Sequence, residues 1–134
     1  MINLKNDKIH IFFGGVGGVN NNEFNHQKII FRYIQQSHSD IIVESSKTLQ
    51  QADAHYTSTP YEALLIKTAD CMPIMLYCNE TKRIAAIHAG WRGIENKIIE
   101  KTLYRFMTTG SAKKDFRFWV GPHISQQSFD VDQD

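Results

Sequence analysis

Four short β-rich segments follow one another in the middle of the chain, and they constrain the fold more than any other feature. They are separated by polar turns, and each is rich in residues that favour strands. The segments are residues 53–57, 63–68, 73–77 and 84–88. This succession predicts a sheet-rich centre. Further strands are expected at residues 8–13, 29–34, 40–44 and 116–120.

An apolar stripe predicts one helix after the last of the central segments. Its members recur at helical spacing, and Gly110 stands where a helix C-cap belongs. The stripe consists of Ile94, Ile98, Ile99, Leu103, Phe106 and Met107. Because no repeat, linker or low-complexity tract interrupts the 134 residues, we expect one mixed α and β domain over residues 1–134.

The charge balance excludes some partners. Fifteen Lys and Arg against fourteen Asp and Glu give a net charge of +1, so no strong field attracts nucleic acid or anionic lipid. No apolar run approaches the ~20 residues that a membrane span needs. The first residues lack the layout of a signal peptide. The sequence therefore predicts a cytoplasmic protein without nucleic-acid or membrane partners, and it leaves the oligomeric state open.

The two cysteines are not expected to form a disulfide. Cys71 and Cys78 are seven residues apart, on either side of a predicted strand. Odd spacings along a strand place side chains on opposite faces, and the cytosol keeps thiols reduced. Each cysteine is therefore either a small buried side chain or a thiolate with a chemical role.

Three metal-ligand residues occur where β-rich segments give way to loops, namely His38, Cys71 and His88. Two imidazoles and one thiolate suit zinc, and three protein ligands with an open fourth position are typical of a catalytic zinc. Spacing alone favours a different interpretation, in which His88 ends a strand, Cys71 fills space and His38 lies on the surface. Along residues 53–57 side chains are expected to alternate in and out, and His55 there carries no motif.

The turn formed by Gly90, Trp91, Arg92 and Gly93 precedes the predicted helix. Backbone N–H groups at a helix start favour an anion, and Arg92 can add a charge-assisted clamp on a phosphate. Alternatively, the glycines make a tight turn and Trp91 packs. Asp70 is a candidate for an outer carboxylate that orients an imidazole, or for an acid or base. A loop Asp that bonds its own backbone is the other interpretation.

Three strings together resemble one known family. TADCMPIML at 68–76, IAAIHAGWRG at 84–93 and GPHISQQSFDV at 121–131 are similar to motifs of the YfiH family of laccase-domain proteins. The family's Q-x-H pattern fits residues 36–38. The resemblance implies that His38, Cys71 and His88 are zinc ligands. It also implies an α+β fold, a layered α/β/β/α sandwich of mixed sheets.

The resemblance implies a zinc-dependent purine nucleoside enzyme. Its expected reactions are phosphorolysis of adenosine, inosine, guanosine and methylthioadenosine, and deamination of adenosine, with purine nucleosides and phosphate as partners. Cys71, His88 and Asp70 are then the expected catalytic residues, while Gly90, Trp91, Arg92 and Gly93 are expected to bind phosphate or substrate. Copper is expected to replace zinc in vitro.

Departures from the family pattern keep other functions open. Gly15 stands where the family usually has an arginine, and the family's C-terminal third is missing, so a truncated domain is expected. One alternative is a copper polyphenol oxidase, although the six histidines form no His-x-His pair. Another is a hydrolase that edits peptidoglycan precursors, with Cys71 as nucleophile and His88 as base. The last is an inactive zinc-binding remnant.

Overall fold

The computed structural model describes residues 2–5, 10–13, 29–107 and 116–121, and these residues form short strands and two helices. In chain order the elements are β1 (Ile2–Lys5), β2 (His10–Phe13), β3 (Ile30–Arg32), β4 (Ile34–Gln35), β5 (Ile42–Glu44), β6 (Gln50–Gln51), β7 (Ala54–Thr57), β8 (Glu62–Leu64), β9 (Met72–Cys78), β10 (Arg83–Ala89), α1 (Trp91–Glu95), α2 (Ile98–Met107) and β11 (Phe116–Val120).

The largest sheet has five strands in the order β11-β9-β10-β7-β5. The first three pairs are antiparallel, whereas β5 and β7 run parallel, so the sheet is mixed. The strands β9 and β10 pair over seven residues and are buried along most of their length. Their apolar side chains form the core together with Ala54 and Tyr56 of β7 and Ile98 of α2. Burying each large side chain stabilises the fold by about 1.5–3 kcal/mol.

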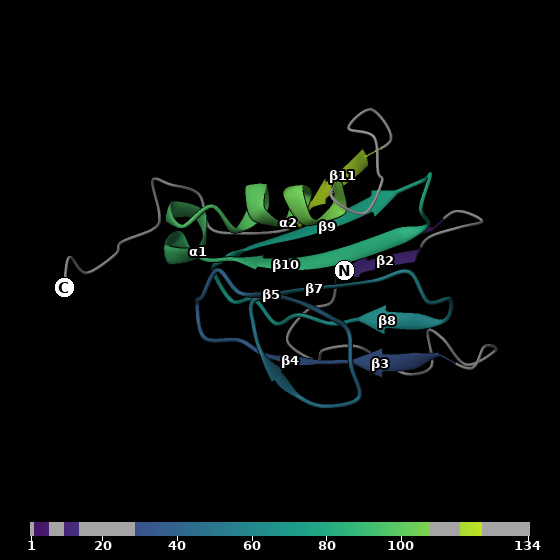
Figure 1. Cartoon of the computed structure of the whole chain (residues 1–134), viewed down its shortest axis with the longest axis horizontal. Helices are drawn as coiled ribbons and strands as arrows, with labels where there is room; N and C mark the ends of the chain where they lie inside the picture. The colour runs from purple at the N-terminus through teal and green to yellow at the C-terminus, as the bar shows by residue number, and fades with distance from the viewer. Residues whose placement is uncertain (1, 6–9, 14–28, 108–115, 122–134) are drawn as a thin grey trace.

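The elements lie in layers. Figure 1 shows the two helices on one side of the five-stranded sheet and the short strands β3, β4 and β8 on the other. The short strands form parallel pairs, β3 with β8 and β4 with β6, while β1 and β2 form an antiparallel pair. The predicted α+β class with mixed sheets is therefore confirmed. Among the described helices, none is long and apolar enough to cross a membrane.

Most predicted strands are present, but several have different bounds. The segment 29–34 is divided into β3 and β4, because the two halves pair with different partners. The strand expected at 63–68 ends at Leu64. The Leu65 N–H still donates to the carbonyl of Arg32 in β3, but the Leu65 carbonyl and the Lys67 N–H are held by the side chains of His55 and Gln36. Two strands were not predicted: β6 is a Gln-Gln pair without apolar alternation, and β1 lies before the first predicted segment.

The prediction of one helix from Ile94 was wrong. The structure has two helices, and the first begins at Trp91, directly after the turn at Gly90. The helices are separated at Lys97, whose φ of 66° is in the left-handed region. Ile94 is 45% exposed because this break takes it out of the face that packs on the sheet. The predicted C-cap and Gly15 lie outside the described residues.

The expected alternation along β7 was also wrong, because all four of its residues are buried. The strand lies between β10 and β5 in the sheet, and layers cover both of its faces. His55 is only 1% exposed. The prediction for the cysteines agrees with the structure, in which Cys71 and Cys78 are both free.

Candidate metal centre

Strand pairing brings the three predicted ligands to one end of the five-stranded sheet. The end of β10, which carries His88, is paired with the start of β9, which Cys71 directly precedes. The parallel pairing of β5 with β7 places the segment before β5, with His38, at the same end. Residues that are 33 and 17 positions apart in the sequence therefore become neighbours.

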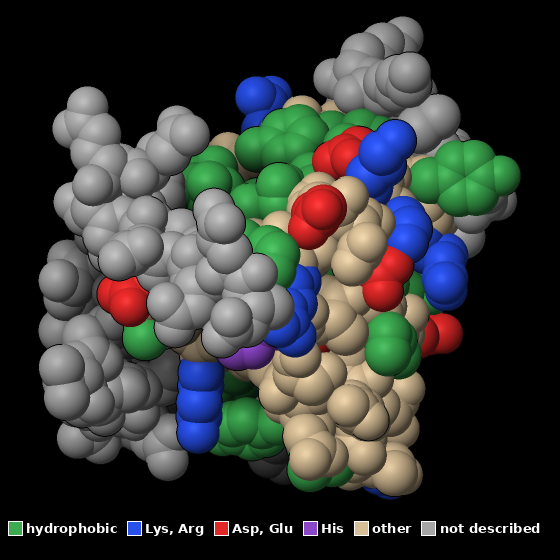
Figure 2. Space-filling view, turned by 90° about the vertical axis from the view of Figure 1, so that its left-hand side faces the viewer, with side chains coloured by type: hydrophobic (Ala, Val, Ile, Leu, Met, Phe, Trp, Pro, Cys, Tyr) green, Lys and Arg blue, Asp and Glu red, His purple; other side chains and the backbone are tan. Residues whose placement is uncertain are grey.

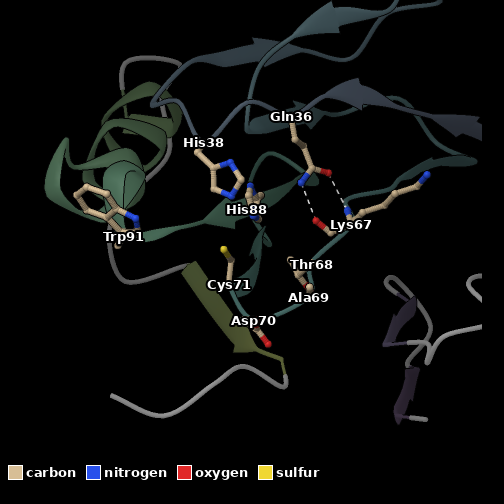
Figure 3. Close-up of a pocket in the computed structure, with 9 residues that line it drawn as sticks. All are labelled: Gln36, His38, Lys67, Thr68, Ala69, Asp70, Cys71, His88 and Trp91. Atoms are coloured by element: carbon tan, nitrogen blue, oxygen red, sulfur yellow. Dashed lines mark hydrogen bonds between the residues drawn. The ribbon is translucent and has the colours of Figure 1, made fainter. Parts of the chain in front are cut away.

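The three side chains form a compact group, as the close-up in Figure 3 shows. Their ligand atoms all lie within 4.8 Å of one another. The rings of His38 and His88 meet edge to face, with centroids 5.0 Å apart. His88 is buried, Cys71 is half-buried and His38 is exposed. The group is therefore anchored in the fold on one side and open to solvent on the other.

An open pocket of about 590 Å³ contains this group. Besides the three ligand residues it is lined by Gln36, residues 67–70 and Trp91. In Figure 3 the carboxylate of Asp70 points away from the three ligand side chains. Figure 2 views the end of the molecule where α1 lies, and histidine surface is visible there beside Lys or Arg side chains. Because the pocket is open and His38 is exposed, a small molecule can reach the three ligand residues from solvent.

One glutamine side chain joins the loops that carry His38 and Cys71. The amide nitrogen of Gln36 donates a hydrogen bond to the carbonyl of Lys67 (2.6 Å), and its oxygen accepts one from the Lys67 backbone N–H (2.7 Å). This pair of bonds replaces strand pairing for the segment before Cys71. His55 supports the same segment, because its Nε2 lies 3.1 Å from the carbonyl of Leu65.

The carboxylate that contacts a predicted ligand imidazole is that of Asp53. Its Oδ2 lies 2.7 Å from Nδ1 of His88, and Asp53 is fully buried. Sequence reasoning placed Asp53 only at the start of a strand and named Asp70 as a candidate for the carboxylate that orients an imidazole. The sequence signal for Asp53 was weak, an acid at the first position of a predicted strand. Its burial, which the structure shows, requires a partner, because acids are almost never fully buried without one.

The surroundings shift the pKa values of two groups here. Burial raises the pKa of the Cys71 thiol, and the negative charges of Asp70 and Asp53 raise it further. Burial also acts to raise the pKa of Asp53, but hydrogen bonds from Ser39, His88 and the backbone outweigh it and hold that pKa below the usual value. The site therefore combines a buried carboxylate whose ionised form is favoured with a thiol whose protonated form is favoured.

The predicted anion-binding turn packs against the metal-ligand group at Gly90. Gly90 and Gly93 are buried, whereas Trp91 and Arg92 are exposed. The Arg92 guanidinium lies 5.1 Å from the centre of the Trp91 ring. A Cβ on Gly93 would lie 3.1 Å from the carbonyl oxygen of Ser39. Both glycines thus allow close packing of the turn, and their predicted role toward phosphate stays a prediction.

Gly90→Ala should disturb the ligand group directly. The added methyl group would lie 3.0 Å from Cδ2 of His38 and 3.4 Å from Sγ of Cys71. We expect His38 to move by a few tenths of an ångström and metal affinity to fall about 10-fold, as for other residues that support metal ligands. Competition with a chelator measures this. Gly93→Ala, whose methyl group meets Ser39 and Ile98 and no ligand side chain, should have the smaller effect. Unchanged affinity of the Gly90 variant would show that the site absorbs the methyl group.

The donor set fits a metal ion. Ligand atoms around a tetrahedral zinc lie about 3.5 Å apart, so a small closure of the group suffices. Two imidazoles and a thiolate suit zinc or copper, and the open side leaves a coordination position free. The fold and this site define a class of protein, a mixed-sheet α+β domain with a His-Cys-His metal-binding group at the strand ends.

Comparison with known proteins identifies the family. Residues 19–134 match the family described as "Multi-copper polyphenol oxidoreductase laccase". A purine nucleoside phosphorylase of Synechocystis is 33% identical over 109 residues, covering 74% of this chain and 41% of that protein. The purine nucleoside phosphorylase YfiH of Shigella flexneri is 37% identical over 83 residues, covering 61% of this chain and 32% of that protein. The chain belongs to this laccase-domain family, the family of the YfiH proteins.

Solved structures agree with the fold. The crystal structure of YfiH from Bacillus licheniformis superposes with a TM-score of 0.73 at 24% identity, covering 84% of this chain and 47% of that chain. The chain thus spans less than half the length of these relatives.

Proposed function

We propose that the chain forms the metal-binding part of a zinc-dependent purine nucleoside enzyme. The observation that carries the proposal is the His38, Cys71 and His88 group in an open pocket beside Trp91. The names of the relatives support purine nucleoside phosphorolysis. The proposed substrates are adenosine, inosine, guanosine and methylthioadenosine with phosphate, and the second proposed reaction is deamination of adenosine.

The proposed roles follow from position. Bound zinc supplies Lewis acidity and positive charge beside the reacting atoms. Trp91 is 38% exposed at the pocket, so its ring offers a surface on which a purine can stack. Arg92, packed against that ring, supplies a cation for phosphate at the turn Gly90 to Gly93. Asp70, exposed at the pocket, is the proposed acid or base.

The raised pKa of Cys71 weighs against the hydrolase alternative. A nucleophilic cysteine needs its thiolate at neutral pH, whereas burial and the charges of Asp70 and Asp53 hold this thiol in its protonated form. Binding of a cation reverses that balance, because metal ligation removes the thiol proton. A ligand role for Cys71 therefore agrees better with its surroundings than a nucleophilic role.

Copper oxidase activity is the second candidate, because the matched family carries that description and a His-Cys-His set also suits copper. Laccase chemistry uses several copper ions held by many imidazoles. Within the described residues we find one group of three ligands. Zinc-loaded and copper-loaded protein should therefore be assayed separately for purine products and for phenol oxidation.

The deciding experiment incubates metal-assayed protein with adenosine, with and without phosphate, and separates the products by chromatography. Adenine that forms only with phosphate supports phosphorolysis, and inosine formed without phosphate supports deamination. Zinc-loaded protein that yields neither product overturns the proposal for this chain and favours a zinc-binding remnant. Oxidation of a phenol by the copper-loaded protein alone would favour the oxidase.

A further inference from the structure

Asp53 lies between the two segments that carry the predicted histidine ligands. It directly precedes β7, and it is fully buried between the loop of residues 37–39 and the end of β10. Its backbone carbonyl accepts a hydrogen bond of 2.7 Å from the backbone N–H of His88. Backbone and side chain of Asp53 therefore both contact the same predicted ligand.

The contact with the His88 ring sets which nitrogen carries the proton. Oδ2 of Asp53 lies 2.7 Å from Nδ1 of His88. An ionised carboxylate only accepts hydrogen bonds, so Nδ1 must donate. In the neutral ring, Nε2 then holds the lone pair and is the atom able to ligate a metal.

The same carboxylate holds the loop that carries the other imidazole. It accepts hydrogen bonds from the backbone N–H groups of Ser37 (3.1 Å), His38 (3.0 Å) and Ser39 (2.8 Å), and from the Ser39 hydroxyl (2.6 Å). His38 has a φ of 62°, in the left-handed region that non-glycine residues rarely adopt. These bonds hold the strained backbone in place and so set the direction of the His38 side chain.

We propose that Asp53 is the positioning residue of this metal centre, which fixes the tautomer of His88 and the loop conformation of His38 through one buried carboxylate. The inference rests on the metal binding proposed above, but it does not depend on which reaction the protein catalyses. It predicts that both imidazoles lose their arrangement together when the carboxylate is changed.

Asp53→Asn is the most informative change because an amide has nearly the same shape. The amide oxygen can replace only one of the two carboxylate oxygens. An amide nitrogen in place of Oδ2 faces the N–H groups of His38 and His88, which favours transfer of the His88 proton to Nε2, the atom that should bind metal. An amide nitrogen in place of Oδ1 instead faces the N–H groups of Ser37 and Ser39 and disturbs the loop that carries His38. We expect zinc affinity to fall about 10- to 100-fold, the usual effect of losing such a partner.

The test combines two measurements on the whole chain. Long-range proton–nitrogen NMR spectra of metal-free protein report the tautomer of His88. Chelator competition reports zinc affinity. Asp40→Asn is the matched control, since Asp40 follows the same loop but pairs with Lys101 at the surface. The control should keep wild-type affinity and tautomer, and melting temperatures check folding.

The outcomes separate the possibilities. An Nδ1–H tautomer in the wild type, with weaker zinc binding after Asp53→Asn, supports the proposal. An Nε2–H tautomer in the wild type overturns it, and this result needs no variant that folds. Unchanged zinc affinity after Asp53→Asn also overturns it. Wild-type protein with the expected tautomer but no zinc affinity would instead overturn the metal binding itself.

Discussion

Cys71→Ala should weaken metal binding by ~100-fold or more while leaving the fold intact. Structural zinc sites with four ligands bind with about 10–16 kcal/mol, so one ligand contributes roughly 3 kcal/mol. Because Cys71 lies at the pocket and is only half-buried, its truncation leaves little cavity in the core. We expect zinc content after dialysis to fall to background, together with any purine nucleoside activity.

Cys78→Ala is the matched control for this change. Cys78 is fully buried in the core cluster and lies at the far end of β9. Its truncation should lower the melting temperature by several degrees, since a cavity of this size costs about 1 kcal/mol. Metal content should stay at the wild-type level. Metal loss in both variants would mean that general instability, and not ligand removal, empties the site.

Acidification should destabilise the metal-free protein through His55. Burial lowers the pKa of His55 from 6.5 to about 4, although the Leu65 carbonyl and the charge of Glu62 act in the opposite direction. Nε2 donates to that carbonyl, and Nδ1 is buried without a hydrogen-bond partner. A second proton on Nδ1 would therefore place a positive charge in the buried sheet with no hydrogen-bond acceptor for that nitrogen.

Proton uptake determines whether stability rises or falls with pH. Between pH 6.5 and about 4 the unfolded chain binds a proton at this residue and the folded chain does not, so stability falls as the pH falls. The stabilisation is complete above the unfolded pKa. At about 1.4 kcal/mol per unit, the shift corresponds to roughly 3 kcal/mol lost by the time the pH reaches the folded pKa.

Urea unfolding of metal-free protein at several pH values tests this prediction. His55→Gln keeps a donor toward Leu65 but removes the titrating ring. The free energy of unfolding of the wild type should fall more steeply than that of the variant across this pH range. Near pH 8, where a histidine of ordinary pKa is already neutral, the two slopes should agree. Parallel curves across the whole range would contradict the assignment to His55.

Ligand chemistry at the ends of β-rich segments made His38, Cys71 and His88 candidates, and the family resemblance favoured them over the interpretation without a metal. The structure brings these three side chains together. The same reasoning did not consider Asp53 as a partner of His88 and named Asp70 as a candidate for that role. Adjacency to Cys71 made Asp70 the better candidate along the chain, whereas the pairing of β7 with β10 brings Asp53 to His88.

There is a physical reason why the sequence predicted some of these features and not others. Strand propensity and the donor chemistry of side chains are properties of short segments, and these sufficed to predict the sheet-rich centre, the strand β11 and the ligand types. Burial on both faces of β7, the break at Lys97 and the contacts of Asp53 depend on which segments become neighbours. The register of β5, β7, β9 and β10 sets those neighbours, and it arises only when the whole sheet closes on its core.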